Sequence, residues 1–345
     1  MRDQAILPCQ TLKTAATAGC LAGLLLLGLA ARAGTAGDVP GTAHPASGPD
    51  DSVFALPTTR DHIGRVLVPV TINGHGPFRF IVDTGANHST IAPRTVLALG
   101  LTPTQEAPFH VDGITGEARA PFVTVDVLRT GDLTIDDAAL PIVWAPVMAG
   151  ADGILGAAGL TGKSLIIDFQ RNRVEIAHHI ETLARSTAIK IHASQLTQGL
   201  ITLDTVIGGV RTCAILDTGS ERSLGNLALR DALKGRRKPG AIAVVTSVYG
   251  ATQEVEPGEL QSAPTIVLDG LRITDAEIVY GDFHIFKVWA LDQKPALIIG
   301  MDVLGTLASL TIDFKNQDIY VASVHNGSNS MTMTSAELNN TAIRH

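Results

Sequence analysis

The chain contains short segments with the hydrophobic pattern of β-strands. Every second position from Val66 to Ile72 is apolar, and Asn73-Gly74 follows directly. An alternating segment that ends in Asn-Gly predicts a strand and a tight hairpin turn. The apolar residues 80–82 then predict a buried returning strand, which carries Asp83 at its end.

A second segment has the same organisation. Residues 200–203 predict a strand, Gly208-Gly209 predicts a turn, and residues 214–216 predict a buried strand that ends at Asp217. Both aspartates are followed by Thr-Gly. The pattern therefore indicates one structural unit that is present twice.

Further landmarks recur downstream of each Asp-Thr-Gly. They share the same order and near-equal spacing in both halves: a glycine 33 residues after the aspartate (Gly116 and Gly250), an apolar segment that ends in glycine (153–156 and 297–300), and an Asp-Phe 12 or 13 residues later (Asp168 and Asp313). Self-similarity of this kind indicates an internal duplication. Each unit spans about 120 residues, a common size for one domain.

These patterns predict an all-β chain with a few short helices. We expect the helices near residues 93–99, 157–160, 224–234 and 301–307. The polar, Gly- and Pro-rich stretches predict the boundaries: a signal peptide (1–33), a disordered linker (34–60), an N-terminal lobe (61–180), an inter-lobe connection (181–198), a C-terminal lobe (199–324) and a disordered tail (325–345).

The N-terminal residues have the order of an export signal. Arg2 and Lys13 precede an apolar run at residues 20–31, and small residues follow up to Ala36. This order predicts cleavage after Ala33 or Ala36 and a periplasmic or secreted protein. The run is shorter than the about 20 residues of a spanning helix. An uncleaved membrane anchor remains the alternative.

Charge and cysteine usage narrow the choice of partners. Without residues 1–33 the chain has 23 basic and 32 acidic residues, and no basic block stands out. Nucleic acid and anionic membrane surfaces are therefore not expected partners. Cys213 is the one cysteine beyond the signal, so we expect a buried, unpaired thiol and no internal disulfide. Export without disulfides favours a bacterial periplasm.

The duplication indicates a specific chemistry. Two related halves packed about a pseudo-twofold axis would bring Asp83 and Asp217 together. Two carboxylates at such a distance share one proton and titrate as a pair. The ionised carboxylate can take a proton from water while the protonated one donates a hydrogen bond to a scissile carbonyl. The sequence assigns these roles to the pair and not to either residue.

The neighbouring residues have expected roles of their own. We expect the threonine side chains to hydrogen-bond across the axis, the glycine N–H groups to face the carboxylates, and the Ser220 hydroxyl to serve its aspartate. The later glycines predict hairpin tips that close over an extended peptide. The dyad-supporting residues are Thr84, Gly85, Thr218, Gly219 and Ser220, and the flap residues are Thr115, Gly116, Tyr249 and Gly250.

On these motifs the chain resembles the pepsin-like and retropepsin-like aspartic peptidases. The resemblance rests on residues 83–86, 217–220, 154–156 and 298–300, and it covers about residues 63–322. It implies two retropepsin-like β-barrel lobes related by a pseudo-twofold axis, with a central cleft. It also implies a monomeric endopeptidase that acts on polypeptides without cofactor or metal and is sensitive to pepstatin-type inhibitors. Bacterial periplasmic retropepsin-like proteins are similar.

The two halves also depart from the family pattern. Asn87 and Glu221 stand where retroviral enzymes usually carry a second Asp, two positions after the glycine of the motif. Asp302 matches the family pattern in the second half, whereas Ala158 replaces it in the first. These departures leave room for a different class of function, a non-catalytic peptide-binding module on the same scaffold.

Two other patterns have less support. Residues 157–164 nearly match a phosphate-binding loop, but the following residues predict a strand where that loop requires a helix. His178-His179 has no further ligand at the spacing of a metal site. We therefore expect neither nucleotide nor metal at these positions.

Overall fold

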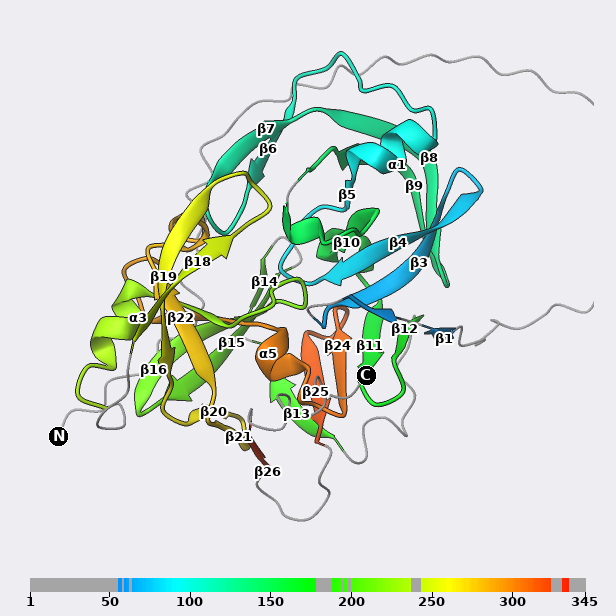
Figure 1. The fold of residues 1–345 in the computed structure, drawn as a ribbon. Coiled ribbons are helices and arrows are strands. Elements are labelled where there is room, and N and C mark those ends of the chain that lie inside the picture. Colours follow the sequence, from blue (N-terminus) through cyan, green and yellow to red (C-terminus); the bar gives the residue numbers. More distant parts are fainter. Residues whose placement is uncertain are drawn as a thin grey trace, which may run out of the picture. The chain divides into compact units, whose positions relative to one another are not determined.

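The computed structural model describes most of the chain after residue 54. The described residues are 55–57, 59–61, 64–144, 146–177, 188–193, 195–197, 200–236, 243–323 and 331–334. The predicted signal peptide and His178-His179 lie outside them. The described residues form predominantly strands, arranged in four sheets (Figure 1). This architecture confirms the predicted all-β class.

The first half forms a seven-stranded sheet and a separate two-stranded hairpin. Its strands are β2 (Thr59–Arg60), β3 (Val66–Ile72), β4 (His75–Asp83), β5 (Thr90–Ile91), β8 (Phe122–Thr130), β9 (Leu133–Pro141) and β10 (Gly153–Gly156), with β6 (Phe109–Asp112) and β7 (Glu117–Ala120) in the hairpin. The strand order is β5-β10-β4-β3-β8-β9, and β2 pairs with β3. Because β10 runs parallel to β4, Gly156 lies opposite Asp83.

The second half forms an eleven-stranded sheet. Its strands are β14 (Gln195–Thr197), β15 (Leu200–Ile207), β16 (Val210–Leu216), β17 (Leu224–Asn226), β18 (Val244–Tyr249), β19 (Val255–Ser262), β20 (Ile266–Leu268), β21 (Leu271–Thr274), β22 (Glu277–Gly281), β23 (Ala296–Ile299) and β26 (Met331–Thr334). Strand β23 runs parallel to β16, with Leu216 opposite Ile299. This pair repeats the arrangement of β4 and β10, as the duplication predicts.

A six-stranded sheet joins the halves. Its strands are β1 (Ala55–Pro57), β11 (Ser164–Asp168), β12 (Arg173–Ala177), β13 (Ile189–His192), β24 (Ser309–Asp313) and β25 (Asp318–Ala322). The order β1-β12-β11-β24-β25-β13 takes three strands from each half. At its centre β11 pairs antiparallel with β24. Backbone hydrogen bonds therefore connect the two halves directly.

Three of the segments predicted outside the lobes contain short strands. Strands β1 and β2 lie inside the predicted linker, β13 and β14 lie inside the predicted connection, and β26 lies inside the predicted tail. Each is only two to four residues long and pairs with another strand of its sheet. Such short edge strands depend on a ladder that distant residues supply, so local composition does not reveal them.

The helices are short and lie next to the site strands. They are α1 (Pro93–Ala98), α3 (Leu227–Ala232), α4 (His284–Val288) and α5 (Met301–Leu304), with 3₁₀ turns η2 (Pro146–Met148) and η3 (Ala157–Leu160). Helix α4 was not predicted. Strand β11 follows η3, which confirms the predicted strand after residues 157–164. Within the described part of the chain no helix has the length and apolarity to cross a membrane.

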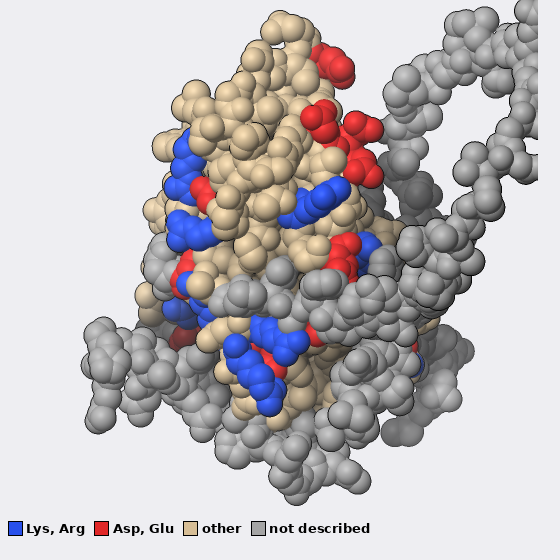
Figure 2. Space-filling view, turned by 90° about the vertical axis from the view of Figure 1, so that its right-hand side faces the viewer, with Lys and Arg blue, Asp and Glu red and all other residues tan. Residues whose placement is uncertain are grey.

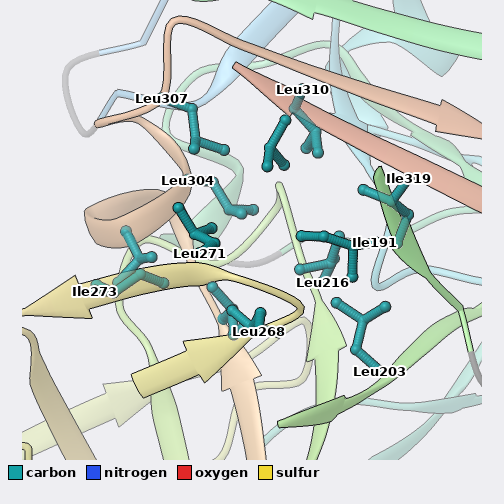
Figure 3. Close-up of a pocket in the computed structure, with 13 residues that line it drawn as sticks. Ile191, Leu203, Leu216, Leu268, Leu271, Ile273, Leu304, Leu307, Leu310 and Ile319 are labelled. Carbon is teal, nitrogen blue, oxygen red and sulfur yellow. The ribbon is translucent and has the colours of Figure 1, made fainter. Parts of the chain in front are cut away.

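The core beneath the second aspartate is entirely apolar. Aliphatic side chains from β13, β15, β16, β21, β23 and β24 surround a cavity of about 20 Å³ (Figure 3). Leu216 and Ile299 line it and directly precede Asp217 and Gly300 in sequence. The loop that carries Asp217 therefore rests on a closely packed base.

Cys213 differs from its expected state. It lies half-buried on β16 and is disulfide-bonded. The expectation of a buried, unpaired thiol at this position is therefore wrong, because the sequence does not indicate which cysteines meet in the fold.

Truncation of Leu310 tests the contribution of this core. Leu310 is fully buried on β24 and lines the cavity of Figure 3. Leu310→Ala should lower the free energy of unfolding by about 2–5 kcal/mol, because the site cannot collapse around the lost atoms. Denaturant unfolding measures this value. The control Leu97→Ala, at a side chain that is 80% exposed, should change it by less than about 0.5 kcal/mol; equal losses would contradict the assignment.

Candidate active site

The two aspartates meet where the parallel strand pairs of the halves end. Asp83 is the last residue of β4, and Asp217 directly follows β16. The Asp217 N–H donates to the Ile299 carbonyl at 3.0 Å, which ties the loop to β23. The two carboxyl groups are hydrogen-bonded to each other. The structure therefore brings together the two residues that the sequence predicted as the dyad.

The glycines of the motifs leave the space in which the carboxyl groups meet. A Cβ on Gly85 would lie 2.5 Å from the Asp217 Cγ, and one on Gly219 would lie 2.2 Å from the Asp83 Cγ. Neither glycine has a positive φ. These glycines are therefore not needed for unusual backbone angles. They are needed because the carboxyl group of the opposite half occupies the position of a side chain.

Thr84 and Thr218 connect the two loops through four buried hydrogen bonds. The Thr84 hydroxyl donates to the Leu216 carbonyl at 2.8 Å, and the Thr218 hydroxyl donates to the Val82 carbonyl at 2.7 Å. Each hydroxyl also accepts from the opposite threonine N–H at 3.1 Å. The predicted contact across the axis is confirmed. Since each hydroxyl both donates and accepts, neither loop can shift without breaking bonds to the other.

Backbone N–H groups hold one oxygen of each carboxyl group. Gly85 and Ala86 donate to Asp83 Oδ1, both at 2.9 Å. Gly219 and Ser220 donate to Asp217 Oδ1 at 2.9 and 3.1 Å.

The Ser220 hydroxyl does not serve its aspartate as predicted. It donates to the Arg222 carbonyl at 2.8 Å. Ser220 therefore supports Asp217 through its backbone N–H, as Ala86 supports Asp83. Because the Ser220 hydroxyl does not contact the dyad, its replacement by the methyl group of Ala86 in the first half does not make the two aspartates unequal.

The environment raises the pKa of both aspartates but to different extents. Burial raises the pKa of Asp83, while hydrogen bonds from Asp217 and from the Gly85 and Ala86 N–H groups, and the charge of Arg65, oppose the increase. Burial and then the negative charge of Asp83 raise the pKa of Asp217 well above its usual range. The two carboxyl groups therefore titrate as a pair that holds one proton between them.

The charge of Arg65 makes the smallest of these contributions to the pKa of Asp83, and this residue was not predicted at the site. Its side chain is buried in an ion pair with Asp61 at 2.7 Å. Its Nη1 also donates to the Gly219 carbonyl at 3.5 Å, a long contact to the loop of the other half. The available signal was a basic residue directly before an apolar strand, which by itself does not indicate burial.

Two hairpin tips close over the dyad. The turn between β6 and β7 contains Thr115 and Gly116, and the turn after β18 begins at Gly250. The hydroxyls of Thr115 and Thr252 lie 3.2 Å apart and are buried. A Cβ on Gly250 would lie 2.6 Å from Thr115 Oγ1. The hairpins β6–β7 and β18–β19 therefore meet tip to tip (Figure 1).

Three of the predicted flap residues, Thr115, Gly116 and Gly250, lie at this contact. Tyr249 instead lies at the rim of the cleft with half of its surface exposed. Thr252 was missed, because no residue at the equivalent position of the first half has a matching role.

The dyad lies in a cleft of about 360 Å³ between the halves. Apolar side chains from the C-terminal half form much of its wall, among them Leu224, Val279, Ile285 and Trp289. The last two belong to α4 and its end, which the sequence analysis missed. The apolar cluster at residues 285–289 was the available signal, but it fits a buried strand equally well.

Asp302 stabilises the loop of the second half. Its carboxylate accepts from the Ser223 N–H at 3.0 Å and from the Ser223 hydroxyl at 2.7 Å, and that hydroxyl accepts from the Gly300 N–H at 3.1 Å. In the first half Ser89 accepts from Gly156 in the same way, although Ala158 stands in place of the acid. Asp302 thus stabilises the loop and does not contact the dyad. Ala158 in the first half therefore removes no group from the active site.

Removal of one threonine hydroxyl should loosen the dyad. Thr84→Val leaves the buried Leu216 carbonyl and Thr218 N–H without partners, and the free energy of unfolding should fall by about 1–3 kcal/mol. The matched control is Thr90→Val, since the buried Thr90 hydroxyl has no partner among the described residues. This control should be neutral or stabilising in denaturant unfolding. Equal destabilisation by both variants would contradict the role of Thr84.

The raised pKa of Asp217 makes stability depend on pH. A carboxyl group whose folded pKa is raised stabilises the fold fully below its unfolded pKa of about 3.9, and this contribution is lost as pH rises through the folded pKa. The stability of the native protein relative to Asp217→Asn should therefore fall as pH increases from about 4 to 8. Denaturant unfolding of both proteins across this range measures the difference. A difference that is constant with pH would contradict the shared proton.

The relation to known proteins agrees with this geometry. A model of the aspartyl protease family matches residues 68–158 and 203–303. The two matched segments include Asp83 and Asp217 and together span more than half of the chain. No curated protein matches the chain. The chain belongs to the aspartyl protease family.

Proposed function

We propose that the protein is an exported aspartic endopeptidase that hydrolyses extended polypeptides with a water activated between Asp83 and Asp217. The observation that carries the proposal is the contact between two buried carboxyl groups with unequal pKa shifts at the base of a cleft. Shared protonation of this kind supplies a general base and a general acid in one site.

The pair of aspartates supplies both roles in this mechanism. The ionised carboxylate of the pair takes a proton from the attacking water, and the protonated one donates a hydrogen bond to the scissile carbonyl oxygen. Water attacks the amide carbon directly, so no covalent bond to the enzyme forms. Two backbone N–H groups donate to the Oδ1 atom of each aspartate, those of Gly85 and Ala86 to Asp83 and those of Gly219 and Ser220 to Asp217. The Oδ2 atoms are left to interact with the water and the substrate.

The shape of the cleft supports an extended peptide as substrate. Strand β18 is the edge strand of its sheet, and Tyr249, at its end, lines the cleft. A peptide in an extended conformation can pair with such an edge through its main chain. The apolar side chains Leu224, Ile285 and Trp289 favour an apolar residue next to the scissile bond.

Substrate entry requires the hairpin tips to separate. Thr115 and Thr252 share a side-chain hydrogen bond of 3.2 Å between the tips, and Glu254 packs against Gly116. One such hydrogen bond contributes about 0.5–1.5 kcal/mol, and the packing contacts must separate as well. Closure over the bound peptide would then exclude bulk water from the reaction.

The proposal includes a monomeric protein in the periplasm or outside the cell. A single chain supplies both aspartates, so catalysis needs no second subunit. On the face drawn in Figure 2, Lys and Arg are interspersed with Asp and Glu among the described residues. This mixture supports a polypeptide partner over nucleic acid, which binds to continuous basic surfaces.

Substitution of either aspartate tests the enzymatic role. Asp83→Asn and Asp217→Asn should each lower kcat by about 10²–10⁴-fold on a denatured protein library, because each removes one partner of proton transfer. Mass spectrometry of the products measures cleavage. The matched control Asp136→Asn, at an exposed position on β9, should cleave as the native protein does. Equal cleavage by all four proteins would rule out the proposal.

The alternative is a peptide-binding module without turnover. It predicts peptide affinity in the native protein with no cleavage between about pH 3 and 8, the range in which such dyads titrate. Inhibition by a pepstatin-type compound, together with loss of cleavage in the aspartate variants, would favour the enzyme.

A further inference from the structure

The β6–β7 hairpin carries a cluster of metal-ligating side chains that the peptidase mechanism does not use. His110 and Asp112 lie two residues apart on β6, and residues at this spacing point to the same face of a strand. Glu117 lies directly opposite Asp112 in the hairpin register. Cross-strand partners have adjacent side chains. The hairpin therefore places two carboxylates and one imidazole on one face.

The distances within this cluster match those of a metal coordination sphere. His110 Nε2 lies 3.2 Å from Asp112 Oδ1 and 3.6 Å from Glu117 Oε2. The three ligand atoms all lie within 4.8 Å of one another. Bonds of 2.0–2.2 Å to a tetrahedral ion place neighbouring ligand atoms about 3.3 Å apart. A small rotation of side chains that are largely exposed would suffice to receive an ion.

A fourth group reaches the cluster from the other half of the chain. His284, at the start of α4, places its Nε2 3.0 Å from Asp112 Oδ1. An imidazole beside a ligating carboxylate either completes the coordination sphere or orients that carboxylate. His284 lies 172 residues from Asp112, so the sequence alone does not place it beside the cluster.

We propose that His110, Asp112 and Glu117, supported by His284, form a binding site for a divalent transition-metal ion of the Zn²⁺ type. Imidazole nitrogen combined with carboxylate oxygen suits Zn²⁺ and its neighbours, whereas Ca²⁺ and Mg²⁺ prefer oxygen ligands alone. The exposed sides of the cluster leave room for a water ligand.

A bound ion would restrain the hairpin. Asp112 lines the cleft, and the Ile285 N–H of α4 donates to the Ile114 carbonyl of the hairpin turn at 3.4 Å. An ion at Asp112 would strengthen this connection between the hairpin and α4. Because a peptide can enter only when the hairpin moves, the ion should slow substrate entry and so inhibit the proposed activity.

Metal titration of the purified full-length protein tests the site without any assay of activity. Co²⁺ is added at pH 7, and binding is followed by visible absorption and by calorimetric competition with Zn²⁺. We expect one equivalent bound, with affinity at least about tenfold weaker in His110→Gln and in Glu117→Gln. Two controls should bind as the native protein does: His75→Gln, at an exposed histidine on β4, and Asp217→Asn, which tests the dyad as the binding site.

The outcomes separate the metal site from the peptidase. Equal affinity in the native protein and His110→Gln, or no saturable binding, would overturn the metal site and leave the peptidase proposal intact. Loss of binding in Asp217→Asn would assign the ion to the dyad and would also overturn the proposed metal site. If cleavage is observed, Zn²⁺ should lower it at least about tenfold more strongly in the native protein than in His110→Gln, in line with the affinity difference.

Discussion

The structure depends on the close contact of two buried carboxyl groups that cannot both be ionised. Burial raises the pKa of each aspartate, and the charge of Asp83 raises that of Asp217 further. Such a contact persists only if the surrounding backbone cannot move apart. The threonine hydrogen bonds and the four N–H donors provide this restraint, and the motif glycines leave the necessary space. The Asp-Thr-Gly motif is therefore a set of steric and hydrogen-bonding requirements for one shared proton.

Duplication provides the framework for this contact, and later divergence makes its two sides unequal. The six-stranded sheet takes three strands from each half and holds the motifs in register. Within this symmetric frame Arg65 acts on Asp83, and α4 widens the apolar wall on one side of the cleft. A symmetric pair would have equivalent aspartates. The additional groups make the two sides of the cleft chemically different.

The base of the cleft is held more firmly than the hairpins that cover it. The dyad rests on an apolar core with a small cavity of about 20 Å³, whereas the hairpin tips meet through a pair of hydroxyls and the contact of Glu254 with Gly116. Local stability follows such differences in buried contacts, so the hairpins open at lower free energy than the base of the cleft. The proposed metal site lies at the connection of the mobile hairpin β6–β7 with α4. Control of entry at this point would leave the dyad itself unchanged.

The sequence by itself determined the strand pattern, the duplication, and the assignment of Asp83 and Asp217 with their threonines and glycines. These features depend on local periodicity and on short motifs whose neighbours are close in the chain. Only the tertiary structure decided the edge strands β1, β13 and β26, the burial of Arg65, the disulfide at Cys213, and the meetings of Thr115 with Thr252 and of Asp112 with His284. Each depends on groups far apart in sequence, and their energies arise from packing and desolvation that no local pattern encodes.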